Sequence, residues 1–276
     1  MLWYPMEGYK KKCPSLETGN LKIEFENVSK AYQQPGRGVY TVLKDISLTI
    51  DSGDFVVILG ESGCGKTTLL NLIAGFDRPS SGRILADSHE IRTVHHSRSM
   101  LFQQPALLPW LNVRKNVAYG CKVRGEHEHL DYRVHQYLEI MGLSGFETAM
   151  PGDLSLGMAQ RVCLARALAG SPRLLLMDEP FASLDTFTRA HIQEELVNIW
   201  LSEQFSVVFV THDIDEAILL GTRVVLLGGD PVGIREVFEI KEPYPRNVNS
   251  NEWFSAYRKW ILKRFKESYV GNRRLL

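Results

Sequence analysis

One segment near residue 60 constrains the fold of this chain more than any other. A continuous apolar run, Phe55-Val-Val-Ile-Leu59, precedes Gly60-Glu-Ser-Gly-Cys-Gly65-Lys66-Thr67, and residues 67–74 then carry apolar side chains at helical spacing. The Gly-rich stretch fits G-x-x-x-x-G-K-[ST], a match expected by chance on the order of once in a hundred chains of this length. The order predicts a buried strand, a Gly-rich turn and a helix, which is a unit of a parallel sheet.

The turn has the composition of a phosphate-binding loop. Glycines let backbone N–H groups converge on an anion at the positive end of the following helix. Lys66 is expected to reach the β- and γ-phosphates of a nucleotide, and Thr67 to offer its hydroxyl to Mg²⁺. A purely structural Gly-rich turn is the alternative. The predicted phosphate-binding residues are Gly60, Glu61, Ser62, Gly63, Cys64, Gly65, Lys66, Thr67 and Thr68.

A second apolar run ends in two acids. Arg173-Leu-Leu-Leu-Met-Asp178-Glu179 predicts a strand that delivers both carboxylates to the edge of a parallel sheet where ligands bind. Asp178 suits the Mg²⁺ shell, and Glu179 suits polarising an attacking water. Acids after strands often only cap helices, but the preceding phosphate loop favours the catalytic role.

The remaining pattern predicts an α/β core interrupted by a helical insertion. Residues 21–25 and 42–50 alternate apolar and polar side chains, which indicates an antiparallel patch. Short apolar runs separated by helical stretches indicate a parallel sheet. Between about residues 104 and 168 the strand pattern is absent. The further strands are expected at residues 174–177, 206–210 and 224–227, and helices at 132–141, 157–169 and 186–201.

Composition excludes several classes of protein. The 276 residues carry 32 basic and 32 acidic side chains, so binding to nucleic acid through bulk charge is disfavoured. No apolar run approaches the roughly 20 residues of a membrane-spanning helix, and residues 1–20 show no secretory signal. Four cysteines without CxxC spacing suit a reducing cytoplasm. His95-His96 and Glu126-His-Glu-His129 lie in polar stretches typical of exposed loops, so Mg²⁺ is the only metal expected.

The net charge of zero is the sum of a basic C-terminal segment and an acidic remainder. Residues 246–276 hold eight basic and two acidic side chains, which gives +6 there and −6 over the rest of the chain. Within this segment an apolar stripe at steps of three and four predicts an amphipathic helix over residues 251–270. Two interpretations are open. In the first, the apolar stripe packs on the α/β body; in the second, the helix contacts anionic lipid headgroups or a membrane subunit. The stripe consists of Phe254, Tyr257, Ile261, Phe265 and Tyr269.

Six motifs in order make residues 21–245 resemble the ATPase subunit of an ABC transporter. The resemblance implies a P-loop NTPase (RecA-like) α/β core with an N-terminal antiparallel β patch and a helical subdomain at about residues 104–168. Residues 1–20 form an extension and residues 246–276 the basic amphipathic helix. Besides the phosphate loop and the acid pair, the motifs are Leu154-Ser-Leu-Gly-Met-Ala-Gln-Arg161 (signature), Phe102-Gln103 (Q-loop), Ala182-Ser-Leu-Asp185 (D-loop) and Thr211-His212-Asp213 (switch histidine).

The resemblance also implies roles for these residues. Two subunits close head to tail on ATP and Mg²⁺, so that Ser155 and Gly157 contact the partner's γ-phosphate at a helix start. Asp185 belongs to the nucleotide-binding set. His212 holds the γ-phosphate and the attacking water, and Gln103 senses Mg²⁺ and relays to membrane subunits. Tyr32 lies where the family stacks an aromatic ring on adenine, although a tyrosine at a strand end is commonly a core or rim residue.

One position departs from the family pattern. The signature usually has Gly where this chain has Leu156. A side chain there restricts the backbone and crowds the phosphate, which predicts a weakened site in an asymmetric heterodimer. Alternatively, the side chain points away and the variant is tolerated.

Two further features resemble importer ATPases for nitrate, sulfonate and taurine. They are the segment Gln103-Gln-Pro-Ala-Leu-Leu-Pro-Trp-Leu-Asn-Val113 and the methionine at position 158 of the signature. The implied partners are a second ABC ATPase subunit, multi-span membrane permease subunits and, indirectly, a solute-binding protein; no nucleic acid is expected. The implied place is peripheral, at the cytoplasmic face of the cell membrane. An ABC ATPase of a lipid transporter or exporter, or a soluble non-transport one, is the alternative. Leu107, Leu108 and Trp110 form either a docking groove or core.

Overall fold

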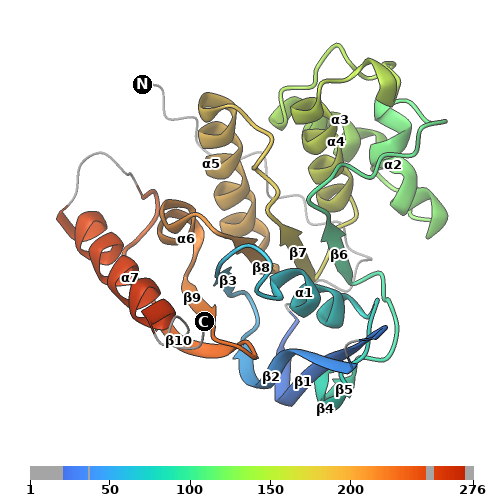
Figure 1. Cartoon of the computed structure of the whole chain (residues 1–276). Coiled ribbons are helices and arrows are strands. Elements are labelled where there is room, and N and C mark those ends of the chain that lie inside the picture. Colours follow the sequence, from blue (N-terminus) through green and yellow to red (C-terminus); the bar gives the residue numbers. More distant parts are fainter. Residues whose placement is uncertain (1–20, 37, 247–251, 271–276) are drawn as a thin grey trace. The chain divides into compact units, whose positions relative to one another are not determined.

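The computed structural model describes residues 21–36, 38–246 and 252–270, and the chain divides into two compact units (Figure 1). The larger unit contains residues 21–104, 172–183 and the described residues from 205 onward. The smaller unit contains residues 105–171 and 184–204. The extension expected at residues 1–20 lies outside the described residues.

A six-stranded sheet forms the centre of the larger unit, with the strand order β10-β9-β3-β8-β7-β6. All neighbouring pairs are parallel except β10 with β9. Every residue of β3, β7 and β8 is buried, which explains why their sequences read as continuous apolar runs. The predicted parallel sheet is confirmed. Its strands are β3 (Phe55–Leu59), β6 (Arg98–Leu101), β7 (Leu174–Asp178), β8 (Ser206–Thr211), β9 (Arg223–Gly228) and β10 (Gly233–Glu239).

A second, antiparallel sheet has the order β2-β1-β4-β5 and confirms the predicted antiparallel patch. The alternating apolar residues of β1 and β2 face inward, where Ile23, Leu43 and Ile46 are fully buried. Helix α1 (Lys66–Ala74) contributes Leu70 and Ile73 to the same core cluster. This packing fixes the start of α1 between the two sheets. The strands are β1 (Ile23–Gln34), β2 (Gly38–Ile50), β4 (Ser81–Ala86) and β5 (His89–Glu90).

The C-terminal helix α7 (Glu252–Val270) lies against α6 (Ile214–Leu220), as Figure 1 shows. Its stripe residues Phe254 and Ile261 are buried, and Trp260 meets Phe238 of β10 edge-on, with ring centroids 4.6 Å apart. The stripe therefore packs on the larger unit, as the first alternative predicted. Ion pairs join Arg258 to Asp215 (2.7 Å) and Arg264 to Glu236 (3.4 Å). The side chain of Tyr269 lies outside the described residues.

The smaller unit is helical, and no strand occurs in its described residues. Asn116 of α2 is fully buried, and its side-chain amide bonds the backbone of Leu108 on both sides: it accepts from the N–H (2.9 Å) and donates to the carbonyl oxygen (3.1 Å). Trp110 is 70% exposed and Leu107 half-buried, so Trp110 is not core, contrary to one of the two alternatives. The helices are α2 (Val113–Val123), α3 (Leu130–Ile140), α4 (Leu156–Ala169) and α5 (Thr186–Glu203), with a short 3₁₀ turn at Pro151–Asp153.

None of the helices in the described part of the chain is long and apolar enough to span a bilayer.

Gly82 in β4 is a glycine whose backbone surroundings leave no room for a side chain. Its φ is +75°, and a Cβ atom there would collide with the backbone carbonyl oxygens of Glu26 and Asn27. Gly125 has the same φ of +75° but nothing within 4 Å of its Cβ position among the described residues. We expect Gly125→Ala to lower the free energy of unfolding by about 1 kcal/mol and Gly82→Ala by at least about twice as much. Urea unfolding of both variants measures the difference; equal losses would contradict the collision.

Candidate functional site

The loop between β3 and α1 forms the floor of the site. Its last residue, Gly65, has a φ of +91°, a left-handed conformation that glycine adopts without steric cost. A Cβ on Gly65 would approach the Val42 Cγ1 atom to 2.8 Å, so the loop packs closely on β2. Helix α1 carries no acidic residue in its first turn and no side-chain cap, which leaves its first N–H groups and positive dipole end for an anion.

Lys66 begins α1 and is almost completely buried, with 5% of its side chain exposed. Its Nζ atom donates hydrogen bonds to the carbonyl oxygens of Gly60 (2.8 Å) and Glu61 (2.7 Å) and lies 3.9 Å from the Glu179 Oε1 atom. The ammonium is therefore held within the loop, where an anionic ligand of the loop would meet it.

Thr67 and Asp178 come together from two elements that are far apart in the sequence. The Thr67 hydroxyl donates to the Asp178 Oδ2 atom at 2.7 Å. Asp178 ends β7 and is 6% exposed; burial raises the pKa of its carboxyl group, although the bond from Thr67 opposes this. A hydroxyl and a carboxylate oxygen are the hard ligands that Mg²⁺ prefers, so this pair fits the ion.

Glu179 directly follows β7, and its carboxylate lies close to the polar side chains of His212, Gln103 and Lys66. Its Oε1 atom lies 3.1 Å from the His212 Nδ1 atom, and its Oε2 atom accepts a hydrogen bond from the Gln103 Nε2 atom at 3.4 Å. Its backbone φ is +43°, which is uncommon for a residue other than glycine. Strained backbone of this kind is often retained at functional sites, and here it aims the carboxylate toward Lys66.

His212 stands in a turn that hydrogen bonds fix on both sides. The Thr211 hydroxyl donates to the buried carboxylate of Glu216 at 2.6 Å and accepts from the Asp213 N–H at 3.0 Å. The Asp213 side chain caps α6 by accepting from the Asp215 N–H at 2.8 Å. The sequence reasoning missed Glu216, whose only signal is a carboxylate five residues after Thr211.

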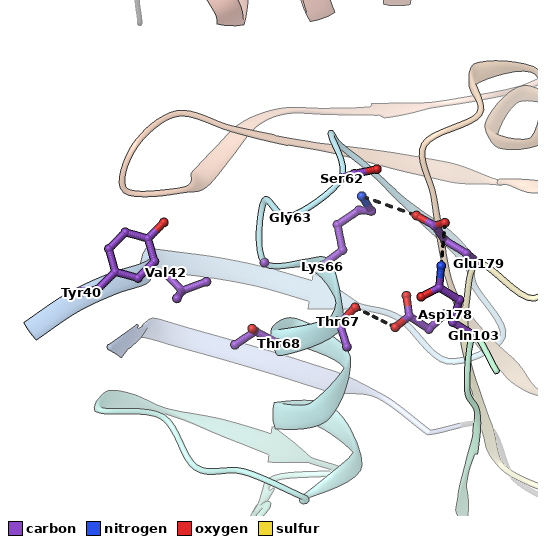
Figure 2. A pocket seen from close by; sticks show the side chains of 11 residues that line it. Tyr40, Val42, Ser62, Gly63, Lys66, Thr67, Thr68, Gln103, Asp178 and Glu179 are labelled. Atoms are coloured by element: carbon purple, nitrogen blue, oxygen red, sulfur yellow. Dashed lines mark hydrogen bonds and ion pairs between the residues drawn. The ribbon is translucent and has the colours of Figure 1, made fainter. Parts of the chain in front are cut away.

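A pocket of about 350 Å³ lies over these groups (Figure 2). Figure 2 shows Lys66, Gln103, Asp178 and Glu179 directed toward one another at one side, and Tyr40 with Val42 at the other. Tyr40 and Val42 were not predicted. Gly60, Glu61 and Cys64 belong to the loop but do not line the pocket. The predicted residues that line it are Ser62, Gly63, Gly65, Lys66, Thr67, Thr68, Gln103, Asp178 and Glu179.

Tyr32, predicted to stack on adenine, does not line this pocket. Its side chain is 41% exposed, and its hydroxyl donates to the Asp77 Oδ2 atom at 2.8 Å. The Lys30 Nζ atom lies over its ring, 4.7 Å from the centroid. Tyr32 is thus held at the hydroxyl and on one ring face by other side chains of the larger unit.

Three predicted residues belong to the smaller unit, and each lies at a helix start. The Ser155 hydroxyl caps α4 by accepting from the Met158 N–H at 3.2 Å, and Gly157 is in the first turn. Asp185 caps α5 by accepting from the N–H groups of Phe187 and Thr188, at 3.2 and 3.1 Å. The pocket takes its lining from the larger unit alone. Leu156, between Ser155 and Gly157, is 60% exposed.

The remaining histidine-rich stretches of the sequence are His95-His96 and Glu126-His-Glu-His129. No group of three or more His, Cys, Asp or Glu residues in the described part of the chain is arranged to hold an ion. The rings of His95 and His96 lie in an exposed loop, tilted by 33° with their centroids 4.3 Å apart, and Glu126 pairs with Arg124 at 2.6 Å.

Comparison with known proteins gives concordant similarities. A family model described as ABC transporter matches residues 43–182. The aliphatic sulfonates import ATP-binding protein SsuB of a Bacillus cereus strain is 42% identical over 246 residues, which cover 89% of this chain and 96% of that protein. A protein of Methanocaldococcus jannaschii named "Uncharacterized ABC transporter ATP-binding protein MJ0412" is 43% identical over 252 residues, 91% of this chain and 93% of its own length.

A solved structure shows the same fold. It is the dimeric structure of a post-hydrolysis state of the ATP-binding cassette MJ0796 bound to ADP and Pi, and it covers 80% of this chain and 100% of its own. The TM-score is 0.72 at 31% sequence identity. These similarities agree with the resemblance that the six sequence motifs carry.

Proposed function

The chain belongs to the ABC transporter family as an ATP-binding subunit with ATPase activity, and we propose that it energises an importer for a small anionic solute such as a sulfonate. The observation that supports ATP hydrolysis as its energy source is the convergence of Lys66, Thr67, Asp178 and Glu179 on one pocket beside the N-terminus of α1. That arrangement offers cationic, metal-binding and basic groups to a single triphosphate.

In the proposed hydrolysis, one side chain accepts a proton and others stabilise negative charge. The Glu179 carboxylate accepts a proton from the attacking water, and His212, 3.1 Å away, orients that carboxylate and the γ-phosphate. Lys66 and the loop N–H groups stabilise the charge that develops on the phosphate oxygens. Thr67, Asp178 and Gln103 would hold Mg²⁺, which would supply positive charge to offset that of the phosphates.

Two subunits are proposed to share each nucleotide. The cassette MJ0796 was solved as a dimer. In such a dimer Ser155 and Gly157 of one subunit face the phosphate loop of the other, where the start of α4 offers N–H groups to the γ-phosphate. Asp185, at the start of α5, lies at the same interface. The side chain of Leu156, between Ser155 and Gly157, is exposed rather than buried in the core of the smaller unit.

The importer assignment rests on the relatives and on the sequence after Gln103. The SsuB proteins of Bacillus cereus strains carry aliphatic sulfonate import in their names. We extend this to membrane permease subunits and a solute-binding protein as partners, at the cytoplasmic face of the membrane. The half-buried Leu107 and Leu108 and the exposed Trp110 offer apolar surface for the permease.

Reconstitution tests this proposal. The chain is combined in vesicles with a permease and a solute-binding protein of a sulfonate importer from its own organism, and uptake of labelled sulfonate, taurine and nitrate is measured with ATP inside. We expect uptake of one of these anions and a several-fold rise in ATP hydrolysis when the loaded binding protein is added. A complex that hydrolyses ATP but moves none of the three anions would contradict the importer assignment and leave the ATPase assignment intact.

A further inference from the structure

We infer that Tyr40 contacts the base of a nucleotide bound in the pocket. The inference rests on the proposed function, because it takes the pocket to hold a nucleoside triphosphate. Tyr40 lies in β2 and lines the pocket with Val42, and its side chain is 53% exposed.

The layout of the pocket gives the first reason. The groups that suit phosphate and metal, Lys66, Asp178 and Glu179, lie together at one side, while Tyr40 and Val42 lie at the other (Figure 2). A triphosphate chain held by the loop leaves its base extending away from the acids. Along this pocket an aromatic ring and an aliphatic side chain are the surface that a purine would meet, and stacking is the interaction they offer.

The second reason is that other side chains already contact the ring and the hydroxyl of Tyr32. Lys30 is 8% exposed, and its ammonium is fixed by the Asp77 Oδ1 atom (2.6 Å) and the Arg78 carbonyl oxygen (2.8 Å) while it covers one face of the Tyr32 ring. The Tyr32 hydroxyl is bound by the same carboxylate. Among the described residues no comparable hydrogen bond or ring contact holds the Tyr40 side chain.

The strand register places the two tyrosines side by side. Tyr32 of β1 is paired directly with Tyr40 of β2. Directly paired residues of antiparallel strands project from the same face, with Cβ atoms roughly 5 Å apart. A base that stacks on Tyr40 therefore lies next to Tyr32. The Tyr32 side chain, held by Asp77 and Lys30, lies beside that of Tyr40.

The test compares a ligand that has a base with one that lacks it. Dissociation constants are measured by displacement of a fluorescent nucleotide for Mg-ATP and for Mg-tripolyphosphate, with the wild-type chain, Tyr40→Ala and Tyr40→Phe. We expect Tyr40→Ala to weaken Mg-ATP about tenfold, because stacking on one aromatic ring is the interaction removed, and to leave tripolyphosphate within about twofold. Tyr40→Phe keeps the ring and is expected within about twofold for both ligands.

Two results would overturn the inference. Tyr40→Ala with unchanged Mg-ATP affinity would show that the ring does not contact the base, and equal weakening of both ligands would show a distorted strand instead. Lys66→Ala separates this failure from failure of the proposed function. If Lys66→Ala weakens both ligands, the pocket is the phosphate site whatever Tyr40 does; if it weakens neither, the nucleotide assignment falls, and the role of Tyr40 with it.

Discussion

Glu179→Gln is expected to lower ATP turnover by about a hundredfold or more while ATP still binds. The carboxylate is the only acid of the pocket that both His212 and Gln103 contact, at 3.1 and 3.4 Å, so it is placed to take the proton of the attacking water. General-base catalysis contributes about a hundredfold to ten-thousandfold. The amide keeps the shape but accepts no proton. Phosphate release measures turnover, and equilibrium binding of Mg-ATP measures affinity.

Glu139→Gln provides the matched control for this experiment. Glu139 is an exposed residue of α3 in the smaller unit, so the same chemical change there should leave turnover unchanged. If Glu179→Gln kept more than about a tenth of wild-type turnover, Glu179 would not be the base, and the water would have to be activated by another group of the pocket.

Lys66→Ala is expected to weaken ATP binding by about tenfold to a hundredfold and to abolish measurable hydrolysis. A charge-assisted hydrogen bond contributes about 1.5 to 3 kcal/mol, and Lys66 is the lysine that lines the pocket. The variant also loses the bonds to the Gly60 and Glu61 carbonyl oxygens, so its thermal unfolding should be recorded alongside.

Lys115→Ala, at an exposed position of α2, is the control for the lost charge. Wild-type affinity in the Lys66 variant would contradict the phosphate-binding role, whereas a loss of affinity together with a large loss of stability would require the milder Lys66→Gln variant to separate the two effects.

The sequence predicts those strands whose pattern reflects burial on both faces. β3, β7 and β8 are buried along their whole length, and their runs are continuous. β10 alternates half-buried and exposed residues, and β6 has four residues, none of them fully buried except Leu101. Four residues are too few for β6 to show a period, and the places of β6 and β10 in the sheet depend on the neighbours with which they pair.

Some residues of the site could likewise be predicted from the sequence, and others could not. Lys66, Thr67 and Glu179 are predictable because each follows a strand within a short motif. Tyr40 and Val42 enter the pocket only because β2 packs on the phosphate loop, where Val42 approaches Gly65. Glu216 supports Thr211 through a bond that no short motif encodes. Contacts of this kind arise from packing between elements, which spacing along the chain does not reveal.

The buried amide of Asn116 has a mechanical consequence for the smaller unit. Besides Leu108 its Nδ2 atom lies within hydrogen-bond distance of the carbonyl oxygens of Leu111 (2.7 Å) and Asn112 (3.2 Å), so one side chain contacts four backbone groups of residues 108–112. Separating them would remove this partner from part-buried backbone groups of Leu108 and Leu111, and a buried polar group left unpaired costs about 1 to 3 kcal/mol. We therefore expect residues 108–112 to move together with α2 as one rigid segment, without a hinge between them.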